Sequence, residues 1–166
     1  MLHTIQAASN DESFLYQLYA TTREAEMAAW GWDASAVNVF LQMQWNAQKR
    51  SYDLQYPDAS HNIILYNDLR VGRMMYANTT EETILIDISL LPEFRNQGIG
   101  TRMIRTLQFE QGLQTTKPIR LSVLKHNPAK RLYERLGFTI NGGNGLYENM
   151  LWFNELVEPD LAFLQK

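Results

Sequence analysis

The residues best suited to binding chemistry lie between Arg95 and Thr101, where the chain reads Arg-Asn-Gln-Gly-Ile-Gly-Thr. This segment follows an apolar, strand-like run and opens a helical pattern, so it predicts a glycine turn at a helix N-terminus. Such a turn presents unpaired backbone N–H groups to a phosphate, and glycine at 98 and 100 removes side chains that would block the approach. A turn that needs glycine for its shape alone is the alternative. A dinucleotide-binding fold is disfavoured, because the third glycine of its fingerprint is missing.

A second segment with polar residues of interest runs from His126 to Phe138. Asn127 and Pro128 predict a helix start, with asparagine as the cap and proline in the first turn, and Gly137 predicts the end of that helix. Tyr133 lies on the apolar stripe of this helix. Taken singly, Asn127 is explained by capping and Tyr133 by core packing, so neither residue alone indicates catalysis.

Together, in this order, the two segments resemble the acetyl-coenzyme A site of the GNAT family of N-acetyltransferases. Arg95, Gly98 and Gly100 match the family's phosphate-binding pattern, and Asn127 and Tyr133 are followed by Leu-Gly-Phe as that pattern requires. The resemblance implies acetyl-CoA as cosubstrate and one family domain spanning residues 1–166. It also implies these cofactor-binding residues: Ile88, Leu90, Arg95, Asn96, Gln97, Gly98, Ile99, Gly100, Thr101 and Asn127.

The resemblance further implies how the acyl group moves. The pantetheine arm would pair with the backbone of the strand that ends at Leu90, where a bulge would aim an N–H at the thioester oxygen. Asn127 would bond the arm, and Tyr133 would lie beside the sulfur and protonate the departing thiolate. A phenol with a pKa of about 10 can serve a thiolate with a pKa of about 8.5 only if it is held in place.

The group that accepts the proton of the amine is less clearly marked. Asp87, on the central strand just before the expected bulge, is the best acidic candidate, and a structural carboxylate bonded to a neighbouring element is the alternative. Ribosomal-protein acetyltransferases of the family often have glutamate where this chain has Ser122. That departure weakens the ribosomal-protein assignment and leaves a water relay open.

The acceptor is therefore predicted only as a primary amine of a small molecule or a peptide, attacked directly without a covalent enzyme intermediate. Polar Gln44 and Gln48 share a helix face with Phe40 and Leu41, so they bind either a substrate or the backbone of 52–57. The aromatic residues of the N-terminal half suit core packing, a homodimer surface or an aromatic acceptor pocket.

Two other hypotheses compete with catalysis. One is a non-catalytic acyl-CoA-binding module, and the other is a purely structural domain of the same fold.

Periodicity predicts the elements that position these residues. Strands are expected at 4–8, 61–66, 71–76, 83–91, 118–123, 138–140 and 146–153. Helices are expected at about 10–22, from 33 or 35 onwards, from 98 onwards and at 128–136, with a further short helix within 155–166. A capping box is expected at Ser9–Glu12. This mixed α/β order matches the GNAT fold, a mostly antiparallel twisted sheet of about six or seven strands flanked by about four helices.

The amino-acid composition limits the kinds of partner, cofactor and location that we expect. The 166 residues carry a net charge of -3 and 45% hydrophobic residues, which disfavours nucleic acid and fits one globular domain. Cysteine is absent and the three histidines are scattered, so no metal site is expected. No apolar run approaches the ~20 residues of a membrane span, and we expect a cytoplasmic protein.

Overall fold

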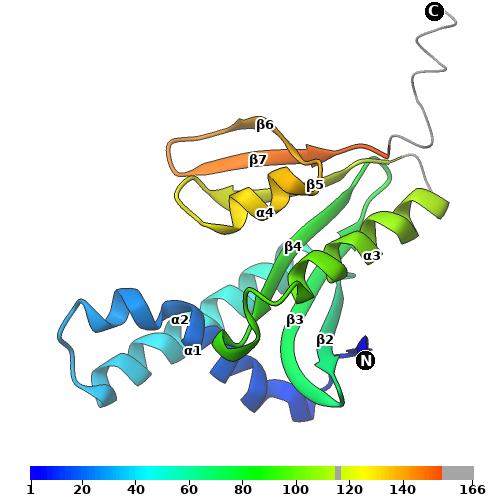
Figure 1. The fold of residues 1–166 in the computed structure, drawn as a ribbon. Coiled ribbons are helices and arrows are strands. Elements are labelled where there is room, and N and C mark those ends of the chain that lie inside the picture. Colours follow the sequence, from blue (N-terminus) through cyan, green and yellow to red (C-terminus); the bar gives the residue numbers. More distant parts are fainter. Residues whose placement is uncertain (115–116, 155–166) are drawn as a thin grey trace, which may run out of the picture. The chain divides into compact units, whose positions relative to one another are not determined.

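The computed structural model describes residues 1–114 and 117–154, which form a mixed α/β fold (Figure 1). Within these ranges there are four α-helices and seven strands. The helices are α1 (Glu12–Ala28), α2 (Ala34–Gln55), α3 (Ile99–Gln114) and α4 (Ala129–Arg135). The strands are β1 (Leu2–Gln6), β2 (Ser60–Tyr66), β3 (Leu69–Asn78), β4 (Thr83–Leu90), β5 (Ile119–Leu124), β6 (Thr139–Gly143) and β7 (Tyr147–Trp152). Short 3₁₀ turns occupy Ser9–Asp11 and Pro92–Phe94.

The strands form one sheet in the order β1-β2-β3-β4-β5-β7-β6. β1 pairs antiparallel with β2, β5 with β7, and β7 with β6, whereas β4 and β5 are parallel. A parallel pair needs a crossover connection, and α3 lies in the segment that joins β4 to β5. The predicted mostly antiparallel sheet of about seven strands is confirmed.

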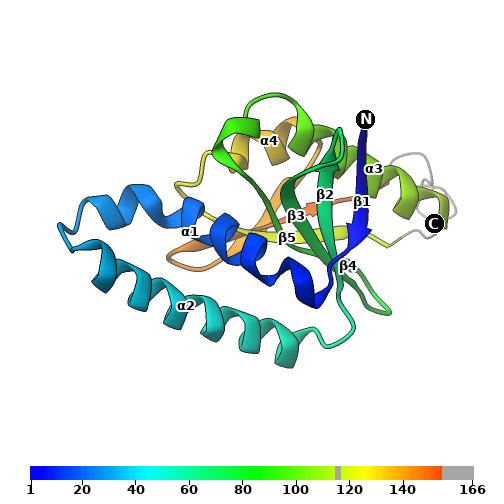
Figure 2. The ribbon, with the colours of Figure 1, turned by 90° about the horizontal axis from the view of Figure 1, so that it is seen from below.

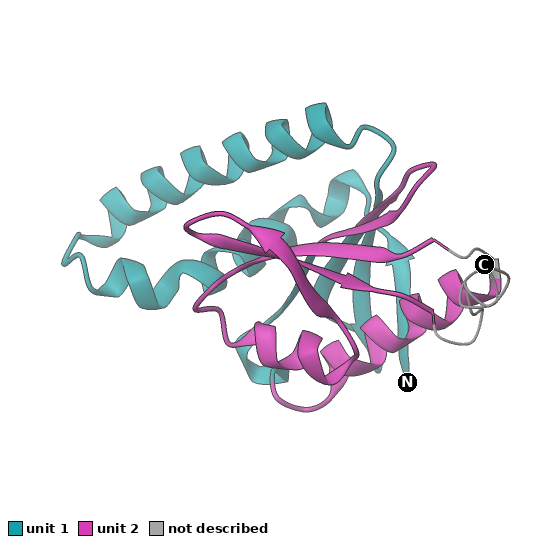
Figure 3. Cartoon of the chain, turned by 90° about the horizontal axis from the view of Figure 1, so that it is seen from above, with its two compact units in different colours: residues 1–75, 87–95 teal, residues 76–86, 96–166 magenta. Residues whose placement is uncertain are grey.

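The chain divides into two compact units (Figure 3). Unit 1 comprises residues 1–75 and 87–95, and unit 2 comprises residues 76–86 and the described residues from 96 onwards. Strands β3 and β4 each begin in one unit and end in the other. The assignment of residues 1–166 to one family domain stays a prediction.

Unit 1 is built around the contact of α1 and α2 with strand β2. Figure 2 shows the two helices side by side. The core cluster comprises Leu15, Trp45, Ile63 and Leu65, and the ring centroids of Tyr16 and Trp45 lie 5.2 Å apart in an edge-to-face arrangement. Asp33 caps α2 as predicted, since its side chain accepts a hydrogen bond from the N–H of Ala36 at 2.8 Å.

Unit 2 has its own core, in which α3 supplies the predicted apolar face. Ile99, Met103, Ile104 and Leu107 are all at most 5% exposed. On β5 the buried and more exposed residues alternate, as expected for a strand with one covered face. Gln108 donates from its amide to the carbonyl of Leu136 at 2.9 Å, which satisfies both polar groups inside this core.

Predicted features near the N-terminus differ from the structure. β1 spans Leu2–Gln6 rather than 4–8, and α1 continues to Ala28 rather than ending near 22, because no glycine or proline interrupts it before Gly31. In place of the capping box at Ser9–Glu12, the carboxylate of Asp11 accepts from the N–H of Ala8 at 2.9 Å. The helix predicted within 155–166 lies outside the described residues.

Candidate functional site

The predicted glycine turn is present, and it opens α3 in unit 2. Asn96 and Gly98 have φ angles of +59° and +82°, in the left-handed region that favours glycine. The first bond of the helix runs from the N–H of Arg102 to the carbonyl of Gly98 at 3.0 Å. The preceding N–H groups, of Ile99, Gly100 and Thr101, therefore have no acceptor within the helix. Asn96, Gln97 and Gly98 are exposed, so a solute can reach the turn.

The end of β4, in unit 1, leads into this turn. Arg95 donates from Nε to the carbonyl of Leu90 at 2.9 Å, and the N–H of Leu91 donates to the carbonyl of Val71 on β3 at 2.8 Å. These two bonds fix the direction in which the chain leaves the strand. Arg95 itself is exposed.

Between two hydrogen bonds that join the β3 side of the hairpin to the β4 side, the β4 side contains one residue more. The N–H of Thr79 bonds the carbonyl of Glu82 at one end, and that of Leu91 bonds Val71 at the other. Between these bonds β3 advances from 71 to 79, whereas β4 advances from 82 to 91, one residue further. An extra residue in one strand of an antiparallel pair is a β-bulge, which leaves main-chain groups without ladder partners.

Asp87, the predicted proton acceptor, belongs to a partly buried polar cluster of unit 1. Its Oδ2 accepts from Arg73 Nε at 2.7 Å and from the hydroxyl of Ser89 at 3.4 Å. Arg73 also donates from Nη2 to Gln48 Oε1 at 3.3 Å. The Arg73 side chain is 8% exposed and that of Asp87 28%, so the carboxylate is oriented from the inside while one side remains reachable. Gln48 therefore accepts a hydrogen bond from Arg73.

His61, on β2, lies in the electrostatic surroundings of this cluster. Burial, together with the positive charge of Arg73, lowers the pKa of His61, and the carboxylates of Asp87, Glu12 and Asp11 oppose that shift only in part. Its Nε2 is buried and has no hydrogen-bond partner among the described residues. The neutral imidazole is the form that this environment favours.

In unit 2, the packing of α3 and α4 brings the second predicted segment next to the turn. A Cβ added at Gly100 would lie 3.6 Å from Leu132 Cδ2, which places the first turn of α3 against α4. The side-chain oxygen of Asn127 accepts from the N–H of Ala129 at 2.9 Å, a bond of the predicted capping kind, although Pro128 rather than Asn127 directly precedes α4. Tyr133 is 9% exposed, and its ring centroid lies 6.0 Å from that of Phe138 in an edge-to-face contact.

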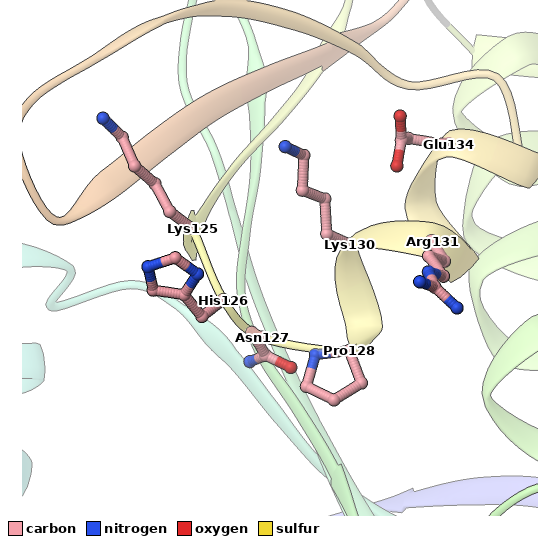
Figure 4. A pocket seen from close by; sticks show the side chains of 7 residues that line it. All are labelled: Lys125, His126, Asn127, Pro128, Lys130, Arg131 and Glu134. Atoms are coloured by element: carbon pink, nitrogen blue, oxygen red, sulfur yellow. The ribbon is translucent and has the colours of Figure 1, made fainter.

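A hollow of about 460 Å³ lies beside the start of α4 (Figure 4). Its lining carries more positive than negative side chains and includes Asn127. The lining residues are Lys125, His126, Asn127, Pro128, Lys130, Arg131 and Glu134. Lys130 bonds Glu148 of β7 at 3.0 Å, which ties α4 to the sheet. The basic lining suits an anionic ligand.

The predicted site residues therefore fall into two sets. Asp87, Ile88, Leu90 and Arg95 lie in unit 1, and 96–101, Asn127 and Tyr133 lie in unit 2. Sequence reasoning did not find Arg73 or His61. The signal that could have found Arg73 is a charged residue inside the apolar strand 71–76, because a buried charge requires a partner.

The described residues include no group of three or more His, Asp or Glu side chains arranged to hold a metal ion. In the same part of the chain, no helix is long and apolar enough to cross a membrane.

Comparison with known proteins identifies a family for residues 58–140, which match the model of the acetyltransferase (GNAT) domain. A curated relative is the [ribosomal protein bS18]-alanine N-acetyltransferase of Haemophilus influenzae. It is 26% identical over 125 residues, which cover 74% of this chain and 73% of the relative.

Solved structures share the fold. The PaiA N-acetyltransferase of Thermoplasma acidophilum, in complex with coenzyme A, aligns with a TM-score of 0.72 at 13% identity, over 93% of this chain and 99% of that one. The ribosomal-protein-S18-alanine N-acetyltransferase of Escherichia coli aligns with a TM-score of 0.66 at 18% identity, over 92% and 94% of the two chains.

The lowered pKa of His61 predicts a pH dependence of stability. In the window between this pKa and the unfolded value of about 6.5, the unfolded chain binds more protons than the folded one. The free energy of unfolding should therefore be highest above pH ~6.5 and fall as the pH drops through that window. Urea unfolding from pH 5 to 8 measures this slope. His61→Gln should flatten it, whereas His3→Gln, an exposed control, should leave it unchanged; an equal slope in wild type and His61→Gln would contradict the assignment.

Proposed function

The chain belongs to the GNAT family of acetyltransferases, and we propose that it transfers an acetyl group from acetyl-CoA to a primary amine by direct attack on the thioester. The observation that carries this proposal is the exposed turn at the start of α3, whose three N–H groups lack helical acceptors. A helix N-terminus of this kind binds anionic phosphate, and coenzyme A carries a pyrophosphate. The similar fold of PaiA N-acetyltransferase, solved with coenzyme A, supports the choice of ligand.

In this proposal the phosphates bind along residues 95–101. The N–H groups of Ile99, Gly100 and Thr101 donate to the pyrophosphate, and the exposed Asn96 and Gln97 border it. Arg95 adds positive charge at the strand end, where its bond to Leu90 already orients it.

The pantetheine arm then follows the backbone of β4, which contributes main-chain groups of Ile88 and Leu90. The extra residue between Glu82 and Leu91 supports this assignment, because a bulge leaves some main-chain groups of a strand without ladder partners. One N–H there stabilises the negative oxygen that forms as the amine attacks the thioester carbon. Asn127 binds the arm through its amide N–H₂, since its side-chain oxygen already caps α4.

Two side chains move the protons. The amine must be neutral to attack, and we assign its proton to Asp87, whose carboxylate is oriented by Arg73 and Ser89. The C–S bond then breaks, and Tyr133 donates its phenolic proton to the departing thiolate. The edge-to-face contact with Phe138 supports this role, because it holds the ring in place.

The acceptor is proposed as a small-molecule or peptide amine. The Haemophilus influenzae relative is named for an alanine of ribosomal protein bS18, which supports a peptide or protein amine. Ser122, where ribosomal-protein enzymes of the family often have glutamate, argues against assigning that substrate. The cytoplasmic location and the homodimer stay predictions.

The effect of acetyl-CoA on the free energy of unfolding tests whether the chain binds this ligand. Acetyl-CoA at 100 times its Kd should raise the free energy of unfolding by about 2.7 kcal/mol. Gly98→Ala and Gly31→Ala form a matched pair, because both glycines have positive φ and neither added Cβ has a neighbour within 4 Å. Each should cost about 1–2 kcal/mol of stability through backbone strain, but only Gly98→Ala should weaken acetyl-CoA binding. Titration calorimetry and urea unfolding measure both quantities, and equal binding by the two variants would contradict the phosphate turn.

The turnover rate of a Tyr133 variant tests the assignment of this tyrosine as the general acid. Tyr133→Phe should lower kcat by at least about 100-fold while the Kd for acetyl-CoA stays unchanged, because the phenol acts only when the C–S bond breaks. Release of CoA thiol, assayed over a panel of polyamines, amino acids and peptides, measures this. Tyr66→Phe, on β2, is the control and should behave as wild type. An unchanged kcat in Tyr133→Phe would remove the tyrosine from the mechanism, and a wild type that binds acetyl-CoA without turnover on any amine would favour a binding module.

A further inference from the structure

Strand β3 contains a glycine, Gly72, against which the backbone of β4 lies closely. A Cβ added at Gly72 would overlap the carbonyl oxygen of Ser89 and lie 2.7 Å from Leu90 Cδ2 and 3.2 Å from Leu90 Cα. All of these atoms belong to unit 1. Contacts under 3.0 Å do not occur for real Cβ atoms, so a side chain at position 72 would force its surroundings to move.

The atoms that would have to move are mostly main-chain atoms. Leu90 Cδ2 ends a flexible side chain and can rotate away, but the carbonyl of Ser89 can yield only if the backbone of β4 shifts. This is the stretch in which β4 carries its extra residue, between Glu82 and Leu91. Gly72 therefore controls how closely the backbone of β4 at Ser89 and Leu90 approaches β3.

Conformational freedom does not explain this glycine. Gly72 is absent from the residues with positive φ, so an alanine there meets no backbone strain of its own. Gly100 offers a contrast, because its added Cβ would meet only Leu132 Cδ2 at an ordinary 3.6 Å. Close approach alone accounts for the glycine at 72.

We propose that Gly72 is a positioning residue for the pantetheine arm: the missing side chain sets the position of the Ile88–Leu90 main chain that receives the arm. This inference rests on the proposed function. It separates the two ends of the ligand, because a shift of β4 at Ser89 and Leu90 changes the pantetheine contacts, whereas the N–H groups proposed to bind the phosphates belong to the first turn of α3. Of the proposed phosphate-binding groups only Arg95 is bonded to β4, through the carbonyl of Leu90.

The test compares CoA with 3′-phospho-ADP, which keeps the phosphates and lacks pantetheine. Gly72→Ala should raise the Kd for CoA by about tenfold, the loss expected for one or two main-chain hydrogen bonds. The Kd for 3′-phospho-ADP should stay within about twofold of wild type. Gly145→Ala is the control, since its Cβ would have no neighbour within 4 Å and its φ is not positive, and it should change neither Kd. Titration calorimetry measures all of these constants.

Three outcomes would overturn the inference or its premise. Equal weakening of CoA and 3′-phospho-ADP in Gly72→Ala would mean a general loss of structure, and unchanged CoA binding would mean that the position of the Ser89–Leu90 backbone does not matter. Wild type that binds neither compound would instead reject the proposed function.

A second measurement uses the wild-type chain and covers the case in which Gly72→Ala does not fold. Amide NMR signals of Gly72, Ser89 and Leu90 should shift on addition of CoA but not of 3′-phospho-ADP, whereas signals of 98–101 should shift with both. Signals of Gly72 and Ser89 that stay unmoved by CoA, while the turn responds, would contradict the proposal.

Discussion

The way β4 leaves its pairing with β3 is the constraint on which the proposed site depends. β4 carries an extra residue between Glu82 and Leu91, the absence of a side chain at Gly72 allows the backbone of Ser89 and Leu90 to approach β3, and the N–H of Leu91 bonds the carbonyl of Val71. Arg95 then fixes the strand end through the carbonyl of Leu90. The glycine turn begins directly after this point. Without the bulge, the backbone would satisfy its own polar groups and offer none to a ligand.

Charge pairing is the second organising feature of unit 1. Carboxylates at Asp11, Glu12 and Asp87 each bond a cation, namely Arg70, Lys49 and Arg73. Arg73 is the most buried of these cations, and a buried guanidinium is tolerated only when its donors are satisfied, which Asp87 and Gln48 achieve.

The sequence predicted those parts of the fold that depend on local patterns. Ile99, Met103, Ile104 and Leu107 marked α3 by their spacing, and Asp33, Asn127 and Gly137 marked helix ends through capping and φ. Gly72 and His61 were missed, because their importance depends on which strand residues face each other, and a register cannot be read from one strand alone. The end of α1 was missed for a different reason: residues 20–28 are good helix formers but carry only a weak apolar repeat.

The central claim is that the acetyl group passes directly from coenzyme A to an amine. Incubation with acetyl-CoA labelled in the acetyl group, followed by mass spectrometry of both protein and small molecules, tests it most directly. We expect label in an amine of the acceptor panel, CoA thiol released in equal amount, and no label on the protein when the amine is omitted. Label bound covalently to the protein, or thiol released without an acetylated amine, would contradict the account.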